Sequence, residues 1–180
     1  YWRALAEMNR QLGMVEPYLL RGAVAARHSV AGQTPLPKPD PRLFDDCAPM
    51  DEPQRYEHMS LLQSWEFAGA DSRLIAVGNY WERGEAFFRL SVDGLKVGES
   101  YVLREPTAAR VFAAPSGRPA WTAEELRGGA LLHVGAMRVS WLVVEPYREG
   151  EGYGEVVPQS DIASAMAARA LAIAEACETQ

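Results

Sequence analysis

Lysine, cysteine and histidine are scarce in this sequence, and their scarcity excludes several functions. Only two of the 18 basic residues are lysines, the net charge is −6, and the arginines are scattered along the chain. Nucleic-acid binding needs clustered cations that neutralise phosphates, so we expect no nucleic-acid partner. Cys47 and Cys177 are too few for a disulfide framework or a thiolate zinc site. Two unpaired thiols are favoured over one bridge between them.

Long apolar runs are also missing. No stretch reaches the roughly 18 continuous apolar residues of a membrane helix, so we expect no membrane partner. The chain opens Tyr-Trp-Arg, without an initiator methionine or a basic leader, and we expect it to be a piece of a longer polypeptide. Its 180 residues, 48% of them apolar, suffice for one domain with a substantial core. The sequence indicates no compartment.

The first third of the chain divides into a helical and a proline-rich segment. Residues 1–30 are predicted to form two short helices that end a preceding domain. The first helix carries its apolar side chains three and four positions apart, at Trp2, Leu5, Met8 and Leu12. Gly13 is expected to end it, and Pro17 suits the first turn of the second helix. Residues 31–58 hold six of the twelve prolines and are predicted to be a connector.

Residues 59–148 change to the period of two that is typical of strands, and the fold class is therefore mainly β with flanking α-helices. We predict an antiparallel β-sandwich of seven or eight strands, because turn residues separate them and no helical crossover joins them. The seven clearest strands cover residues 61–67, 73–81, 86–92, 99–105, 109–112, 130–134 and 138–145. Thr122 and Glu125 have capping-box spacing, which indicates a helical turn. Residues 149–180 are predicted to be a loop and a C-terminal helix capped by Ser160 or Asp161.

No constellation of residues points clearly to catalysis. The acidic cluster Asp45, Asp46, Asp51 and Glu52 contains the paired carboxylates that glycoside hydrolysis needs. It falls in the connector, however, where water is expected to solvate it, whereas catalytic carboxylates are usually held on rigid elements. The three histidines are His28, His58 and His133, and none has a second ligand at metal-binding spacing. A nucleophile elbow is absent, and the glycine run at 150–154 lacks the Lys-Ser/Thr ending of a phosphate loop. We expect no catalytic residue, metal or cofactor.

Aromatic residues are the remaining candidates for a binding site. Flat aromatic rings stack on the apolar faces of sugars, which makes Tyr80 and Trp81 candidate carbohydrate-binding residues beside the turn at 82–85. Trp65 and Trp141 lie in the middle of alternating segments, where core packing is the favoured interpretation. Trp81 is the tryptophan that we expect to be most exposed.

The order of these features resembles the C-terminal end of a glycoside hydrolase of the α-galactosidase type. In that family the last helices of a (β/α)8 barrel lead through a connector into an antiparallel β-sandwich. The resemblance covers roughly residues 15–147 and is carried by EPYLLRGAV, LLQSWEF, RLIAVGNYW, FFRLSVDGLKVGESYVLRE and GGALLHVGAMRVSWLVVEPY. A full barrel needs about 250 residues, so the resemblance implies that the catalytic part lies outside this chain. The helix after Pro158 has no counterpart in the resemblance.

The sequence therefore predicts an accessory, non-catalytic domain that packs on and stabilises the catalytic domain of a glycosidase in the same polypeptide. One alternative is a carbohydrate-binding module that holds polysaccharide or oligosaccharide through exposed aromatic residues. Another is a structural or oligomerisation domain, because the predicted helices carry more apolar surface than a lone sandwich needs. In that case the partner is a second copy of the chain.

Overall fold

The computed structural model describes residues 2–33, 61–81 and 84–178. These residues are mainly β, with eleven strands and three α-helices, as the sequence predicts. The strands form one sheet of eight strands and one of three. All seven strands predicted from the alternating pattern are present, whereas four further strands, β1, β2, β8 and β11, are not among those predicted.

Seven strands of the larger sheet lie side by side in one order, and the eighth pairs with one of them. Its strands follow one another in the order β1 (Ala23–Ala25), β3 (Leu62–Ala68), β4 (Arg73–Asn79), β10 (Arg138–Pro146), β6 (Ser100–Glu105), β7 (Arg110–Phe112) and β11 (Glu155–Val157), and β8 (Ala120–Thr122) pairs with β6. β4 is buried along its whole length, as its continuous apolar sequence predicts. The prediction of a purely antiparallel arrangement is wrong at one place. β11 pairs with β7 in parallel, because the chain crosses back through residues 147–154 before it joins the sheet.

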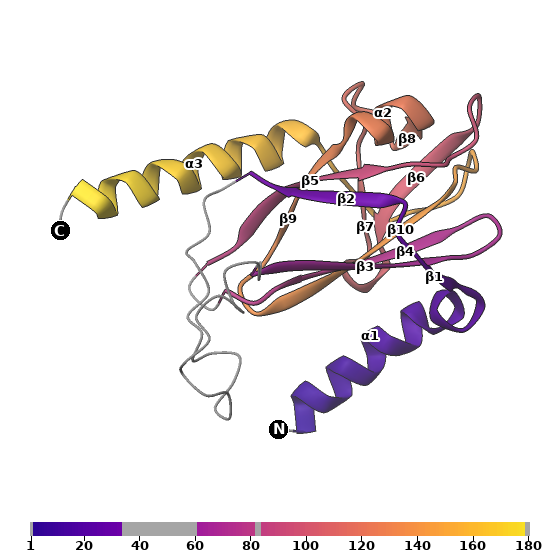
Figure 1. Ribbon diagram of the computed structural model, residues 1–180, viewed down its shortest axis with the longest axis horizontal. Coiled ribbons are helices and arrows are strands. Elements are labelled where there is room, and N and C mark those ends of the chain that lie inside the picture. Colours follow the sequence, from indigo (N-terminus) through magenta and orange to yellow (C-terminus); the bar gives the residue numbers. More distant parts are fainter. Residues whose placement is uncertain (1, 34–60, 82–83, 179–180) are drawn as a thin grey trace, which may run out of the picture.

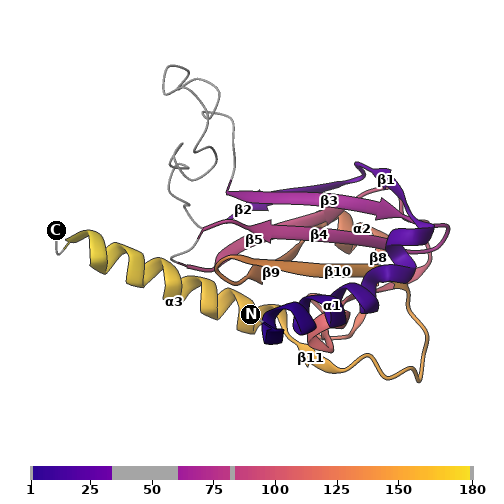
Figure 2. The same ribbon diagram turned by 90° about the horizontal axis from the view of Figure 1, so that it is seen from below.

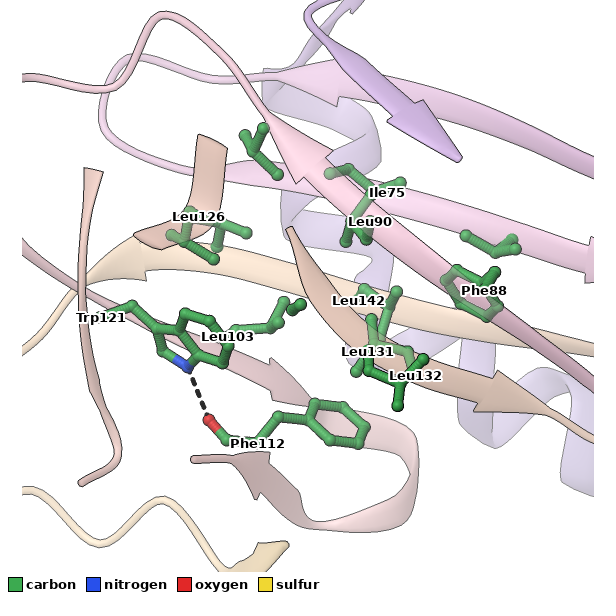
Figure 3. Packing of buried hydrophobic residues seen from close by; sticks show 14 of the residues in the cluster. Ile75, Phe88, Leu90, Leu103, Phe112, Trp121, Leu126, Leu131, Leu132 and Leu142 are labelled. Atoms are coloured by element: carbon green, nitrogen blue, oxygen red, sulfur yellow. Dashed lines mark hydrogen bonds between the residues drawn. The ribbon is translucent and has the colours of Figure 1, made fainter. Parts of the chain in front are cut away.

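The smaller sheet shares a hydrophobic core with the larger one. It consists of β2 (His28–Gly32), β5 (Ala86–Val92) and β9 (Ala130–Val134) in that order. Phe88 and Leu90 of β5 enter the same cluster as Ile75 and Leu142 of the larger sheet (Figure 3). Trp121 is fully buried there, and its indole N–H donates a 2.7 Å hydrogen bond to the carbonyl oxygen of Phe112, which satisfies its only polar atom.

Helices lie on the outside of both sheets. α1 (Trp2–Arg21) lies on the outer face of the larger sheet, and α2 (Ala123–Gly128) and α3 (Gln159–Glu178) lie on the side of the smaller sheet (Figure 1). A short 3-10 turn, η3 (Pro106–Ala108), joins β6 and β7. The predicted capping box is confirmed, because Thr122 and Glu125 satisfy each other's backbone N–H groups at the start of α2. The predicted C-terminal helix is also confirmed as α3, but its predicted cap is wrong, because the helix already begins at Gln159 and Ser160 and Asp161 lie inside its first turn.

The prediction of two short helices in residues 1–30 is wrong. One helix, α1, runs through Gly13 and Pro17, and residues 23–25 and 28–32 are strands. Burial of the C-terminal half of α1 on the sheet, where Val15 is fully enclosed, outweighs the helix-weakening effect of these two residues. The helix ends at Gly22, where a Cβ atom would lie 2.7 Å from the Tyr18 carbonyl oxygen and 2.9 Å from Phe67 Cβ. Only glycine allows the chain to turn there so close to β3.

Candidate functional site: the outer face of the larger sheet and an adjacent polar corner

α1 covers only one part of the outer face of the larger sheet. Leu74 and Val143 are buried under Val15, and Tyr18, Leu19, Phe67 and Trp141 pack around them. The helix crosses β10 in Figure 2, and its N-terminal half continues past this cluster. The outer face therefore has a sealed end under the helix and an uncovered end beyond it.

A hydrogen-bonded triad fixes the helix at the sealed end. The Tyr18 hydroxyl donates to Glu145 Oε2 at 3.1 Å, and Arg104 donates to both the Tyr18 oxygen, at 2.8 Å, and Glu145 Oε1, at 2.6 Å. Burial, together with the adjacent Glu145 carboxylate, raises the pKa of Tyr18 above its usual range. The phenol therefore stays a neutral donor, which keeps α1 in one register on the sheet.

A groove of about 650 Å³ opens between the N-terminal half of α1 and the sheet. Its helical wall contains Met8 and Leu12, which continue the apolar stripe of Val15 and Leu19 at spacings of three and four residues. The opposite wall is formed by residues of β10 and the turn before it, Met137, Arg138, Val139, Ser140 and Trp141. Large apolar side chains are exposed on both walls, at Met8, Leu12, Met137 and Val139.

A second feature of the same face is a shallow trough along β4. The register places Ala76 between Trp65 of β3 and Trp141 of β10, and Gly78 between Gln63 and Val139. Small residues thus form the floor, and large ones the walls. Tyr80 stands at the end of the trough, and a Cβ atom on Gly78 would lie 3.5 Å from its ring and 3.6 Å from that of Trp65. The two rings lie against Gly78, which is itself buried, and the other sides of both rings are exposed.

The structure separates the two aromatic residues that the sequence predicts to bind carbohydrate. Tyr80 is 42% exposed and belongs to the trough, whereas Trp81 is partly buried beside α3. The guanidinium of Arg169 lies 5.3 Å from the centre of the Trp81 ring. Trp81 is therefore not the most exposed tryptophan, and that expectation is wrong. Trp65, interpreted as a core residue from its position in the strand, is 43% exposed and stands near Tyr80 instead. Alternation predicts which side chains share a face, but not which face is covered.

A polar cluster occupies the corner where the chain passes from β1 in the larger sheet to β2 in the smaller one. Glu66 is its centre, with a side chain that is 0% exposed. One carboxylate oxygen accepts hydrogen bonds from the Arg27 backbone N–H and from His28 Nδ1, and the other accepts from Arg73 at 2.7 Å. The second nitrogen of His28, Nε2, lies 2.9 Å from the Ser64 hydroxyl. Three donors surround the buried carboxylate, so its charge is satisfied.

The environment of Glu66 fixes the proton positions in this cluster. Burial alone would raise the pKa of Glu66, but the hydrogen bonds from Arg27, Arg73 and His28 outweigh it and hold the pKa below its usual range. An ionised carboxylate only accepts hydrogen bonds, so His28 Nδ1 carries a proton. In the neutral imidazole Nε2 is then an acceptor, and Ser64 is the donor to it. Sequence reasoning missed this cluster because its members are 36 and 38 residues apart, and no local spacing joins His28 to β3.

The remaining candidates from the sequence are the acidic cluster, two histidines and Cys47. Asp45, Asp46, Asp51, Glu52, His58 and Cys47 lie outside the described residues, as does most of the predicted connector. His133 is a strand residue, as predicted, and it lies 3.1 Å from Glu85 and is stacked on Phe87. Within residues 2–33, 61–81 and 84–178, no group of three or more potential metal ligands comes together. None of the helices in this part of the chain is long and apolar enough to span a membrane.

Comparisons with known proteins found no match for this chain, whether among family models, curated proteins or solved structures.

Proposed function

We propose that this chain is an accessory, non-catalytic β-sandwich domain of a carbohydrate-active enzyme, which packs on and stabilises the glycosidase domain of the same polypeptide. Two sheets that share one core support the sandwich assignment. The sequence resemblance to α-galactosidase-type enzymes supports the carbohydrate assignment. Non-catalytic refers here to glycoside hydrolysis; the two carboxylates that line the groove, Glu7 and Glu105, are each paired with an arginine.

The observation that carries the proposal is the groove between α1 and β10, which exposes large apolar side chains on both walls. Met8 and Leu12 extend the stripe whose other half is already buried, so this half suits the same kind of contact. Burying a large apolar side chain contributes about 1.5–3 kcal/mol, so a partner that fills the groove gains considerable stability. The acidic groups on the walls, Glu7 and Glu105, are already paired with Arg10 and Arg110. An apolar ridge of a neighbouring domain is therefore the occupant that the groove suits.

The test uses the polypeptide that contains both this chain and the proposed catalytic domain. The double variant Met8→Asp/Leu12→Asp is expected to lower the melting temperature of the catalytic domain, because two charges are placed in the contact. Val97→Asp is the matched control, since Val97 is an exposed apolar residue that does not line the groove. An unchanged melting temperature in the double variant, or hydrolysis of aryl glycosides by this chain alone, contradicts the proposal. A self-associated chain that the double variant makes monomeric supports the oligomerisation alternative instead.

The trough supports a second candidate function, binding of a sugar chain. Trp65 and Tyr80 present exposed rings on either side of Gly78, and a pyranose ring stacks on such surfaces through its apolar face. Trp65→Ala and Tyr80→Ala are then each expected to weaken binding in a glycan array and by calorimetry. Trp81→Ala is expected to leave binding unchanged, because this ring is covered by Arg169. Absence of binding to a broad glycan panel contradicts this function.

A further inference from the structure

The Ser64, His28 and Glu66 side chains form a connected chain of hydrogen bonds that the proposed packing function does not use. The Ser64 hydroxyl lies 2.9 Å from His28 Nε2, and His28 Nδ1 lies 3.1 Å from Glu66 Oε2. A nucleophile next to a base, and a base oriented by a carboxylate, is the arrangement that activates a serine. It is recognised by geometry rather than by sequence order or fold.

The carboxylate is the most shielded member of this hydrogen-bonded series. Ser64 is partly exposed as a residue, the His28 side chain is 8% exposed, and the Glu66 side chain is 0% exposed. The carboxylate that orients the base is thus shielded from water. Since Glu66 is ionised and His28 carries its proton on Nδ1, the lone pair on Nε2 faces the hydroxyl proton.

The backbone N–H of Ser64 takes no part in the strand pairing that the structure describes. The Tyr80 N–H donates to the Leu61 carbonyl oxygen, and this hydrogen bond sets the alternation of the β3–β4 ladder. By that alternation the Ser64 N–H points away from β4, toward the edge where β1 lies. β1 pairs with β3 only at residues 66–68, so no described strand pairs with Ser64 at this edge. A backbone N–H of the nucleophile's own residue can donate to an oxyanion.

We propose that Ser64 is an activated nucleophile and that, with His28 as general base and Glu66 as the residue that positions it, it cleaves small carboxylic esters. Ser64 Oγ attacks the ester carbonyl carbon, and its proton moves to His28 Nε2. The bond to the alcohol oxygen breaks, and the alcohol leaves with that proton. Water then attacks the acyl-Ser64 ester, gives one proton to His28, and releases the carboxylic acid as the proton returns to Ser64. No cofactor is required.

The substrate has a short acyl group, because the hydroxyl lies at the corner between two sheets, with β2 beside it. Acetyl esters are therefore the suitable probe class. This site shares no residue with the groove or the trough. The test of esterase activity is therefore independent of the test of the proposed packing function.

The test is covalent labelling of the full 180-residue chain with a fluorophosphonate, followed by mass spectrometry of its peptides. We expect a single label on Ser64, which Ser64→Ala abolishes. Ser29→Ala is the matched control: Ser29 is more exposed than Ser64 and adjacent to His28 in sequence, so labelling by exposure alone would favour it. A folded chain in which Ser64 stays unlabelled, or in which Ser29 is labelled equally, overturns the proposal.

Hydrolysis of 4-nitrophenyl acetate supplies a second readout. His28→Gln is expected to slow it by about 100-fold or more, the usual contribution of a general base. Glu66→Gln is expected to change its pH profile, since the base is then no longer opposite a carboxylate. Circular dichroism shows whether each variant is folded. If both variants are unfolded, the labelling of Ser64 against Ser29 still decides the proposal. A rate unchanged in Ser64→Ala relative to the parent chain also overturns it.

Discussion

The two faces of β4 are covered in different ways. Ile75 and Val77 on the inner face are fully enclosed by the smaller sheet, whereas the outer face passes from Leu74, buried under α1, to Gly78, which lies under the partly exposed rings of Trp65 and Tyr80. Both faces carry small or apolar residues. The inner face is a completed contact, and the outer face is complete only where the C-terminal half of α1 covers it.

This difference indicates which residues of the two faces contribute mainly to stability and which contribute mainly to binding. Substitutions on the inner face are expected to act on folding, because they leave cavities or unpaired groups in a closed core. Substitutions at the uncovered end of the outer face are expected to act on binding, because little is packed there. The following predictions test whether the loss of unfolding free energy decreases from the inner face to the uncovered end of the outer face.

Phe88→Ala is expected to have the largest effect, because Phe88 is fully enclosed between the sheets. Truncating a buried phenylalanine costs about 3–5 kcal/mol of unfolding free energy. Phe67→Ala on the outer face provides a matched comparison, since Phe67 is only partly buried under α1. Urea denaturation followed by tryptophan fluorescence measures both. Equal losses in the two variants would remove the proposed difference between the faces.

The inner face is also where sequence reasoning is most successful. The alternation in residues 86–92 predicts Phe88, Leu90 and Val92 as inward and Arg89 and Ser91 as outward. Burial confirms the three inward residues and Arg89, whereas Ser91 is half-buried and Phe87, on the outward side, is fully buried. Alternation works for these residues because the inward side of β5 packs against the larger sheet in a closed core.

The outer face and the polar corner could not be predicted in the same way. Trp65 and Phe67 follow one alternating pattern, yet α1 covers one of them and leaves the other exposed. That outcome depends on where a helix ends, which is decided by the close contact at Gly22. The corner depends on β1 and β2, short strands with no clear alternation, which bring His28 to β3 from a distant part of the chain.

Glu66→Gln is the next largest perturbation. It leaves the Arg73 guanidinium buried without its anion, and we expect a loss of about 1–3 kcal/mol, the usual cost of a hydrogen bond to a buried charged group. The pKa of Glu66 is lowered in the folded chain, so the carboxylate stabilises the fold fully above the ordinary value of 4.5. This contribution is lost as the pH falls through the lower folded pKa. Stability of the parent chain, measured by thermal melting, should therefore fall with acid more steeply than that of the variant.

Tyr18→Phe tests the sealed end of the outer face. The ring stays in place, but the hydrogen bonds with Glu145 and Arg104 are removed. Because Glu145 and Arg104 still pair with each other at 2.6 Å, the loss should be limited to about 0.5–1.5 kcal/mol. Chemical denaturation measures it. A loss as large as that of Phe88→Ala would show that α1 depends on the hydroxyl rather than on its apolar stripe.

Trp65→Ala should have the smallest effect on folding, although it removes the largest kind of side chain. Trp65 is 43% exposed and lies on the uncovered end of the sheet, and substitutions at such positions usually change stability by less than about 0.5 kcal/mol. The same variant removes one of the two exposed rings of the trough, so it should weaken the binding of a ligand there. A stability loss of several kcal/mol in urea would instead make Trp65 part of the core, and the outer face would then be closed at both ends.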